Sequence, residues 1–446
     1  MSFSRTTCKK EMSKESALLE ELKWRGLLHT VTPNLDLSEP TTVYLGIDPT
    51  GASLHIGSLL PIMCMNKFIE HGHKVILLLG NGTAMIGDPS GKRNERSMLS
   101  NTAIDDNMAR IESQLKSLVP GAVIMRNADW LQEFSILGFL RNVGKHFSMS
   151  YMRAKESVRS REDAGMSFTE FSYMLLQAYD FMHLWKNHGC TLQIGGSDQW
   201  GNITCGIELI KRTYGKNAHG MTFPLLTGPN GEKFGKSVSG SVWLDPKMTS
   251  PYHFHQFWLN VDDASVVQYL KYFTSLSEDS IQNIEENLKE YSDKRIAQSA
   301  LAYAVTRFVH GEQEVLRINQ VRELLFGDGG DMSSLKEDEI VSLLGSITIR
   351  QRPIPDSGMR LNELLHNAGL FTSKGAARRA IESGGLYMNG SRMSDPNANV
   401  MRSGMLHGKY IIVRKGKKDH SLISFEASKE EQEAGILTDQ EQKALS

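Results

Sequence analysis

The sequence lacks the features that mark membrane-spanning or disulfide-stabilised secreted proteins. No apolar run approaches the roughly 18 residues of a membrane-spanning helix, so we expect no membrane partner. The four cysteines, Cys8, Cys64, Cys190 and Cys205, are widely separated and form no CxxC pair. This spacing argues against a zinc knuckle and against a secreted disulfide framework. The opening MSFSRTTCKK is basic but has no apolar segment of a secretory signal.

The sequence also has no excess of positive or negative charge. Lys and Arg number 50 and Asp and Glu number 51, so the net charge of -1 selects no partner, although local basic patches can still occur. With 446 residues, 40% of them hydrophobic, the chain is long enough for two or three globular domains. We expect a cytoplasmic protein; the alternative, for a eukaryotic chain, is the mitochondrial matrix or another organelle, with residues 1–17 as a targeting segment.

Residues 41–250 alternate strand and helix patterns. TTVYLGI (41–47) and KVILLLG (74–80) are β-rich runs that end at turns, and LLPIMCMNKFIEHG (59–72) between them has helical apolar spacing. This βαβ pattern predicts an α/β fold with a parallel sheet. Thr191–Asn202, TLQIGGSDQWGN, adds a strand followed by a Gly-rich polar turn. Ligands of open α/β sheets bind at such strand ends.

The remainder of the chain has a different character. Residues 277–326 show helical periodicity without strand signals. The polar stretch RQRPIPDSG (350–358) is typical of a linker, and a compact segment follows it to about Phe425. The last residues, 426–446, are acidic and lack aromatics, as in a disordered or loosely helical tail.

His55 and Gly57 stand directly before a predicted helix. The first N–H groups of a helix attract phosphate, and a glycine lets a base or sugar approach the backbone. A histidine at this position is more often a cap or a packed side chain. A second signal lies in EKFGKSVSG, where Lys233 and Lys236 flank a glycine and Ser237 follows. Two such lysines can clamp a pyrophosphate, and a solvated surface loop is the alternative.

These two signals, separated by an α/β core, resemble the class I aminoacyl-tRNA synthetases. HIGS is similar to their HIGH motif and KFGKS to their KMSKS motif. The stretches YLGIDPT, MIGDPSGK, FTEFSYMLLQAYDF and LQIGGSDQWGNIT narrow the resemblance to the bacterial-type tyrosyl-tRNA synthetase family, over residues 18–425. It implies a ligase that activates L-tyrosine with ATP to tyrosyl-adenylate and then transfers tyrosine to the 3′ end of tRNA(Tyr).

The resemblance also implies a domain order and a homodimer. The expected segments are an N-terminal extension (1–17), a Rossmann-like catalytic domain with a dimerising insertion (18–248), an α-helical anticodon-binding domain (249–348), a linker (349–358), a small α+β S4 RNA-binding domain (359–425) and an acidic tail (426–446).

The family's tyrosine-binding residues match positions in these stretches and at two places between them. Tyr44 and Asp180 match the pair that holds the phenol, and Tyr173, Gln177 and Asp88 match the groups around the ammonium. Thr83 and Asn127 match further pocket residues, and Gln199 lies on the substrate-carboxylate side. On a helix, Tyr173, Gln177 and Asp180 share one face. Without the resemblance, a packed Tyr173 beside two solvated polar residues would be the simpler interpretation.

The ATP side is implied in the same way. The matching residues are Gly46, Asp48, Gly57, Ser58, Gly196, Asp198 and Ser237, together with Thr50 and His55 at the γ-phosphate and Lys92, Arg96, Lys233 and Lys236 as cations that close over pyrophosphate. The tyrosine carboxylate is already a nucleophile, so catalysis needs positioning and charge stabilisation without a general base. Mg²⁺ would arrive with ATP, and no dedicated metal ligands are expected.

Two positions depart from the family pattern. Ser58 stands where the motif has its second histidine, so one ribose contact becomes shorter or water-mediated. Asn81 stands where a second glycine is common. Both departures bear on ATP affinity.

The C-terminal segment resembles an S4 RNA-binding domain and is rich in cations. The residues expected to contact tRNA phosphates are Arg360, Lys374, Arg378, Arg379, Arg392, Arg414, Lys415, Lys417 and Lys418. Without the resemblance, a solvated basic face would be the ordinary interpretation.

Two rival functions remain open from the sequence. Tryptophanyl-tRNA synthetase shares the fold, but Tyr44 and Asp180 suit a phenol. An RNA-binding structural protein, such as an intron-splicing cofactor, could keep the scaffold without depending on catalysis; His55, Lys233 and Lys236 argue against lost activity.

Overall fold

The computed structural model describes residues 16–90, 99–159, 165–226, 234, 236–237, 240–326, 332–344, 348–351, 354–355, 357–416 and 419–425. The chain divides into two compact units, one from residues 1–248 and 258–305 and the other from residues 249–257 and 306–446. Within the described ranges, no helix is long and apolar enough to span a bilayer.

The first unit is built on a six-stranded sheet in the order β1-β6-β5-β2-β3-β4, parallel except for β1. The strands are β1 (Thr30–Val31), β2 (Thr42–Ile47), β3 (Lys74–Leu79), β4 (Val123–Arg126), β5 (Cys190–Gly196) and β6 (His219–Phe223). The predicted βαβ unit is confirmed, and β2 and β3 pair in register from Thr42 and Lys74 onward. The strand order reverses between β2 and β5, the position where open α/β sheets bind ligands.

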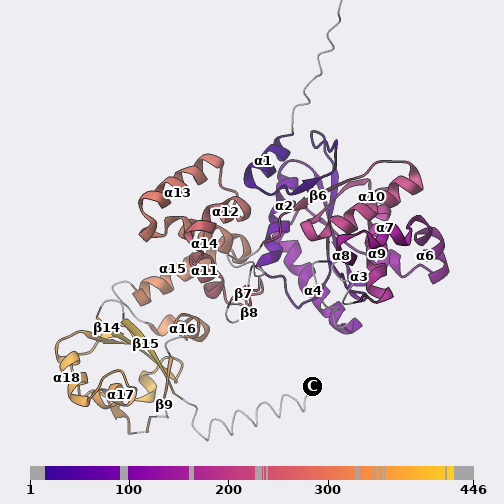
Figure 1. Cartoon of the computed structure of the whole chain (residues 1–446). Helices are drawn as coiled ribbons and strands as arrows, with labels where there is room; N and C mark the ends of the chain where they lie inside the picture. The colour runs from indigo at the N-terminus through magenta and orange to yellow at the C-terminus, as the bar shows by residue number, and fades with distance from the viewer. Residues whose placement is uncertain are drawn as a thin grey trace, which may run out of the picture. The chain divides into compact units, whose positions relative to one another are not determined.

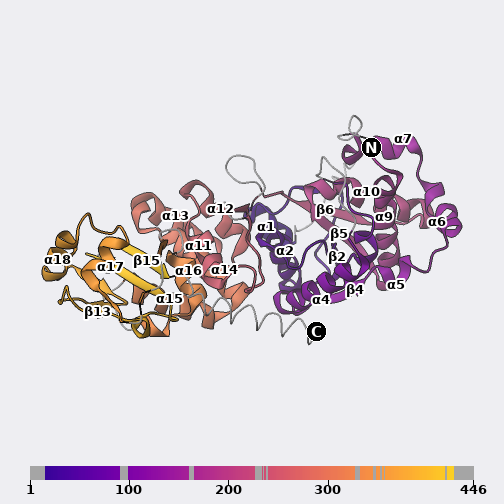
Figure 2. The same cartoon turned by 90° about the horizontal axis from the view of Figure 1, so that it is seen from below.

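Helices cover both faces of this sheet. α2 (Leu59–Glu70) lies on one side, and α9 (Phe168–His188) and α10 (Trp200–Tyr214) lie on the other (Figures 1 and 2). Tyr44, Ile76 and Leu78 belong to the same buried cluster as apolar residues of α9 and α10. The core thus fixes α9 against the face of β2 that carries Tyr44.

Seven further α-helices belong to the described part of this unit before α9. They are α1 (Ala17–Arg25), α3 (Asn81–Ala84), α4 (Asn101–Leu118), α5 (Ala128–Leu131), α6 (Ile136–Asn142), α7 (Met149–Arg153) and α8 (Glu156–Arg159). A two-stranded ribbon is formed by β7 (Lys236–Ser237) and β8 (Gly240–Ser241).

The predicted helical domain is shared between the two units. α12 (Asp263–Phe273) and α13 (Glu278–Glu290) lie in the first unit, whereas α15 (Glu312–Phe326) and α16 (Glu337–Leu344) lie in the second. The boundaries fall inside α11 (Pro251–Leu259) and α14 (Ile296–His310). α12 is attached to the first unit by the buried Arg25, whose guanidinium donates to the carbonyl oxygens of Lys271, Thr274 and Leu276. This guanidinium satisfies carbonyls at a helix end.

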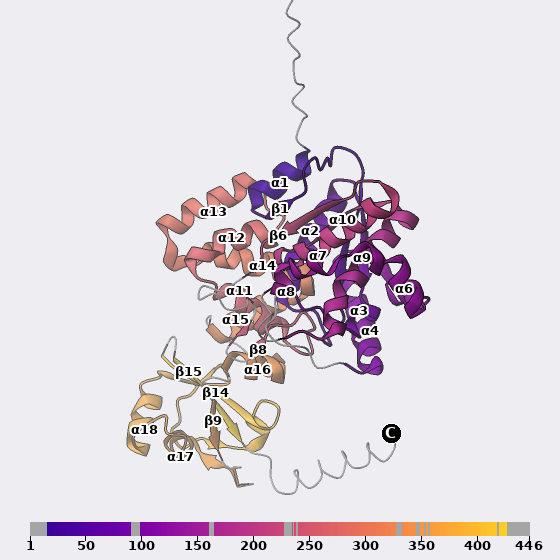
Figure 3. The same ribbon diagram turned by 45° about the vertical axis from the view of Figure 1, so that its right-hand side comes forward.

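The second unit contains a five-stranded sheet in the order β12-β11-β14-β15-β9. Its strands are β9 (Thr348–Gln351), β11 (Leu386–Met388), β12 (Ser391–Arg392), β14 (Tyr410–Lys415) and β15 (Asp419–Phe425). α17 (Leu361–Asn367) and α18 (Lys374–Glu382) pack beside it (Figure 3). β10 (Met359–Arg360) pairs with β13 (Asn399–Val400). The expected small α+β domain is present.

The predicted linker at 349–358 is wrong in its first residues. Thr348–Gln351 forms β9, which pairs parallel with β15. Ile349 packs against the C-terminal core and Ile354 is buried in it. These apolar contacts fix the segment in the domain, although its proline and glycine content had predicted a linker. The predicted tail (426–446) and residues 1–15 of the predicted extension lie outside the described residues.

Candidate active site

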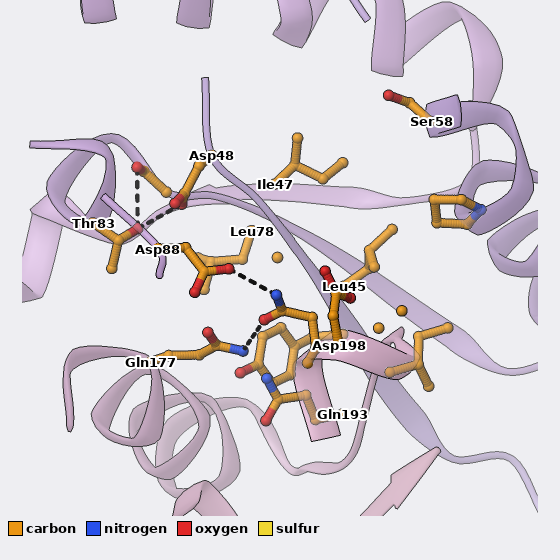
Figure 4. A pocket seen from close by; sticks show the side chains of 18 of the residues that line it. Leu45, Ile47, Asp48, Ser58, Leu78, Thr83, Asp88, Gln177, Gln193 and Asp198 are labelled. Carbon is orange, nitrogen blue, oxygen red and sulfur yellow. Dashed lines mark hydrogen bonds between the residues drawn. The ribbon is translucent and has the colours of Figure 1, made fainter. Parts of the chain in front are cut away.

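A pocket of about 330 Å³ opens at the carboxyl ends of β2, β3 and β5. It brings together most residues singled out in the sequence: Tyr44, Gly46, Asp48, Thr50, Gly57, Ser58, Thr83, Asp88, Asn127, Tyr173, Gln177, Asp180, Gly196, Asp198 and Gln199. Figure 4 shows several of these side chains converging on the pocket. Its place at the strand-order reversal agrees with the expectation from topology.

The carboxylate of Asp180 is the most buried acid of the pocket. Asp180 is 2% exposed; Asn127 Nδ2 donates to Oδ2 at 3.0 Å and Trp130 Nε1 donates to Oδ1 at 2.8 Å. Burial raises the pKa of Asp180 to about 7, although these two hydrogen bonds act in the opposite direction. Trp130 was not predicted as a site residue from the sequence. Its position three residues after the predicted pocket residue Asn127 was the only signal that could have identified it.

The hydroxyl group of Tyr44 completes this end of the pocket. It is buried and has no hydrogen-bond partner among the residues that the structure describes. Burial, with Asp180 and Cys190 nearby, raises the pKa of Tyr44, so the phenol stays neutral and can donate a proton. Gln193, which pairs in register with Tyr44, also lines the pocket and has a buried Oε1 unpaired within the described part of the chain. Sequence reasoning missed Gln193.

A chain of hydrogen bonds runs from Asp48 toward Asp180. Thr83 Oγ1 donates to Asp48 Oδ1 at 2.7 Å, and Asn127 Nδ2 donates to Thr83 Oγ1 at 2.9 Å (Figure 4 shows the first of these). Gly80 makes room for this chain, because a Cβ there would lie 1.9 Å from Asp48 Oδ1 and 2.4 Å from Thr83 Oγ1. Asp48, which the sequence analysis assigned to the nucleotide side, is therefore connected to Asp180 through Thr83 and Asn127.

A second polar cluster joins the middle of α9 to the turn that follows β5. Gln199 Nε2 donates to Asp88 Oδ2 at 2.7 Å, and Gln177 Nε2 donates to Gln199 Oε1 at 3.3 Å (Figure 4). Asn202 Nδ2 lies 3.0 Å from Gln177 Oε1 and 3.4 Å from Asp88 Oδ1. Asn202 is 1% exposed and was not predicted, although it lies within the quoted SDQWGN turn. The cluster presents several oxygens to a cationic group.

His55 caps the helix that follows it. Its Nδ1 accepts from the backbone N–H of Gly57 at 3.0 Å, before the 3₁₀ turn Ile56–Ser58 leads into α2. A Cβ at Gly57 would lie 2.7 Å from Cε1 of His55, so glycine permits this ring position. The ring is exposed and stands edge-on to Trp243, at 6.2 Å between centroids. The expected helix start is confirmed, and His55 lies beside the pocket without lining it.

The two departures from the family pattern have structural roles. Asn81 Oδ1 accepts from the backbone N–H of Ala128 at 3.1 Å, which ties α3 to α5. Ser58 lines the pocket at the start of α2.

The predicted cationic loops fall largely outside the described residues. Lys92, Arg96 and Lys233 are not described, and only the backbone of Lys236 and Ser237 is, in β7. The described ranges contain no group of three or more His, Cys, Asp or Glu that could hold a metal ion.

The basic residues of the C-terminal domain differ in accessibility. Arg360, Lys374, Arg378, Arg379, Arg392 and Lys415 are exposed, and two of these form surface ion pairs, Lys374 with Glu363 at 2.7 Å and Arg378 with Glu382 at 2.8 Å. Arg414 does not fit the expected exposed cluster, because it is 8% exposed and its guanidinium lies 4.1 Å from the Tyr387 ring centroid. Lys417 and Lys418 lie outside the described residues.

Comparisons with known proteins agree with this geometry. Residues 36–327 match the family "tRNA synthetases class I (W and Y)", and residues 346–423 match the "Tyrosine--tRNA ligase SYY-like C-terminal domain". The fold and pocket are therefore those of a class I aminoacyl-tRNA synthetase, which uses ATP as a substrate.

Curated relatives narrow the class. The tyrosine–tRNA ligase of Roseiflexus castenholzii is 47% identical, over 92% of this chain and 99% of that protein, and that of Geobacillus kaustophilus is 46% identical with the same coverage. A crystal structure of C-terminally truncated Aspergillus nidulans mitochondrial tyrosyl-tRNA synthetase has a TM-score of 0.64 and 32% identity, over 71% of this chain and 96% of that one. The chain belongs to the tyrosine–tRNA ligases, and its partners are tyrosine, ATP and tRNA. This family assignment argues against the tryptophanyl-tRNA synthetase alternative.

Proposed function

We propose that this pocket selects tyrosine by its phenol, which lies between Asp180 and Tyr44. The observation that carries the proposal is a buried carboxylate next to a buried hydroxyl that has no partner among the described residues. The substrate hydroxyl donates to Asp180, which already accepts from Asn127 and Trp130, and accepts from Tyr44, so the Tyr44 hydroxyl gains its partner when a phenol is present. A site of this kind rejects an analogue that lacks the hydroxyl because its own polar groups stay unpaired, a rule for which tyrosyl-tRNA synthetase is itself the established example.

Equilibrium dialysis with labelled L-tyrosine and L-phenylalanine tests this assignment. Asp180→Asn is expected to weaken tyrosine binding by about tenfold or more, since a hydrogen bond to a charged group is lost. Phenylalanine binding should stay weak and unchanged. Equal loss for both ligands would place the phenol elsewhere.

The ammonium of the substrate lies at the second polar cluster. Asp88 supplies a carboxylate, and Gln177 and Tyr173 supply neutral oxygens next to it on α9. Gln199 holds Asp88 in place and faces the substrate carboxylate. In this proposed orientation the α-carboxylate faces Thr50, Gly57 and Ser58, which line the pocket near the start of α2.

The chemistry follows from this orientation. A tyrosine carboxylate oxygen attacks the α-phosphorus of ATP, the bond from that phosphorus to the β-phosphate bridging oxygen breaks, and pyrophosphate leaves with the electron pair. His55 and Thr50 bind the phosphates, and Lys92, Arg96, Lys233 and Lys236 stabilise charge on the leaving group. Gly46, Gly196 and Asp198 border the nucleoside, and Mg²⁺ enters on ATP. A ribose hydroxyl at the 3′ end of tRNA(Tyr) then attacks the adenylate carbonyl and releases AMP.

The C-terminal domain binds tRNA(Tyr) through its exposed cations. Arg360, Arg379, Arg392 and Lys415 are exposed to phosphates, Lys374 and Arg378 are exposed within surface ion pairs, and Lys417 and Lys418 add to the sequence cluster. Phosphate contacts release counterions, so tRNA affinity should fall steeply with salt.

A second copy of the chain covers α6. Ile136, Leu137 and Leu140 lie on this one helix and are 77, 76 and 48% exposed, with Met149 and Phe168 also exposed in the same unit. Such an apolar face is typical of a symmetric homodimer contact. Leu137→Lys should yield monomers in sedimentation velocity. Val123→Lys, at an exposed apolar residue of β4, is the matched control and should stay dimeric.

A further inference from the structure

The indole of Trp130 is held on two sides by the same helix. Trp130 is 5% exposed, and its Nε1 donates to Asp180 Oδ1 at 2.8 Å. The imidazole of His183 stacks on the indole, with ring centroids 4.2 Å apart and 12° between the planes. Asp180 and His183 are three residues apart on α9, a spacing that places both on one side of the helix.

The direction of the indole N–H depends on the plane of the ring. An indole has a single donor that lies in this plane, so tilting the ring misaligns the bond to Asp180. Trp130 stands on α5, which has only four residues, Ala128–Leu131. The stacked imidazole supplies a flat surface that restrains the plane, as offset aromatic pairs do.

His183 is itself held in place. Asn187 Nδ2 lies 3.3 Å from His183 Nε2, one turn further along α9, and the ring of Tyr179 lies 6.1 Å away between centroids. Burial lowers the pKa of His183, which favours the neutral ring that can accept this hydrogen bond. His183 is half-buried and does not line the pocket, so any effect on the substrate passes through Trp130.

We propose that His183 is a positioning residue for amino-acid selection: it stacks on Trp130, keeps the indole N–H aimed at Asp180, and thereby holds the carboxylate where the substrate phenol meets it. The inference rests on the proposed role of Asp180. It assigns a selectivity role to a side chain that touches neither tyrosine nor ATP.

The test compares kcat/KM for tyrosine and phenylalanine in tyrosine-dependent ATP–pyrophosphate exchange. His183→Ala should lower the tyrosine-to-phenylalanine ratio by about 2- to 10-fold, the range expected for loss of an aromatic pair. The loss should appear in KM for tyrosine, while kcat and the values for phenylalanine stay unchanged, because phenylalanine has no hydroxyl for Asp180. His183→Phe keeps a flat ring and should restore the ratio.

A double-mutant cycle ties the effect to the indole. In a Trp130→Phe background, which keeps a ring but removes the N–H, His183→Ala should cause no further loss of the ratio. His29→Ala, an exposed histidine just before β1 that has no contact with His183 or Trp130, is the control and should leave the ratio intact. Thermal unfolding of each variant identifies any that are merely misfolded.

Two results would overturn the inference. One is an unchanged ratio in His183→Ala while Asp180→Asn lowers it; then Asp180 selects the phenol without help from His183. The other is an equal loss for both amino acids, which indicates a purely structural residue. If Asp180→Asn itself leaves the ratio unchanged, the proposed role of Asp180 in selecting the phenol is wrong, and the inference about His183 is wrong as well because it rests on that role.

Discussion

The hydroxyl group of Tyr173 lies 2.8 Å from Oδ2 of Asp48, joining α9 to the residue that follows β2. Burial, together with Asp48 and Asp88, raises the pKa of Tyr173, so the phenol is the donor in this bond. The other oxygen of Asp48 accepts from Thr83. The bond therefore links α9 to the loop that follows β2.

Tyr173→Phe should lower kcat/KM for tyrosine by about tenfold or more, because a hydrogen bond to a carboxylate is lost next to the ammonium site. Steady-state pyrophosphate exchange measures this. Tyr179→Phe, on the same helix with its ring packed on Phe134 at 4.6 Å, is the control and should change little. Equal effects of the two substitutions would contradict a specific role for the Tyr173–Asp48 bond.

The buried carboxylate of Asp180 should reduce the stability of the ligand-free protein as pH rises. Its pKa is about 7 in the folded chain and about 4 when unfolded, so ionisation costs more in the folded state. The free energy of unfolding contributed by this group therefore falls between about pH 4 and about pH 7 and is constant above. Asp180→Asn should be more stable than the parent at pH 8, by an amount on the order of a few kcal/mol.

Urea unfolding of both proteins from pH 5 to 8 measures this difference. Other titrating groups are common to both chains and cancel. The advantage of Asp180→Asn should grow toward pH 7 and then level off; a difference that does not vary with pH would show that Asp180 is not the titrating group.

Gly80→Ala should disrupt the series of hydrogen bonds from Asp48 through Thr83 to Asn127. The new Cβ would collide with the side chains of Asp48 and Thr83, so we expect a loss of stability of about 1–3 kcal/mol and weaker tyrosine binding. Gly46→Ala is a steric control for stability alone, since a Cβ there meets nothing within 4 Å. Equal stability of the two variants in thermal unfolding would contradict the close contact.

Truncation of the chain near Pro353 should separate tyrosine activation from tRNA charging. It should also destabilise the part of the second unit that remains. The pocket residues all lie in the first unit, so pyrophosphate exchange should survive. Removing β14 and β15 exposes the apolar side chains of α15 and α16 that pack on them, and it also removes the Lys409–Glu337 ion pair. We expect strong binding of a hydrophobic dye and severely reduced tRNA charging.

Two outcomes would contradict this division. Full-length rates of charging by the truncated chain would mean that the C-terminal domain does not bind tRNA productively. Loss of exchange would mean that the second unit supports the pocket.

The sequence predicted those elements whose signals are local. The apolar runs of β2 and β3 and the helical spacing of Tyr173, Gln177 and Asp180 needed no knowledge of distant contacts. Family resemblance then supplied the roles of these residues, which spacing alone left open.

The missed residues depend on contacts between distant segments. Trp130 matters because its N–H meets Asp180, 50 residues away, and Asn202 because it reaches Asp88, 114 residues away. β9 was not predicted, because the Pro- and Gly-rich residues that follow it indicated a linker. It is a strand because it pairs with β15. Contacts between segments so far apart in the sequence cannot be predicted from local composition.

The measurement that most directly tests the account is amino-acid discrimination by Tyr44→Phe and Asp180→Asn. Steady-state ATP–pyrophosphate exchange gives kcat/KM for tyrosine and for phenylalanine in each protein. We predict that both variants lose most of the parent's preference for tyrosine, and that the double variant loses little more, because the two groups bind one hydroxyl. Retention of the parent's preference in both variants would contradict the central claim that the phenol lies between Tyr44 and Asp180.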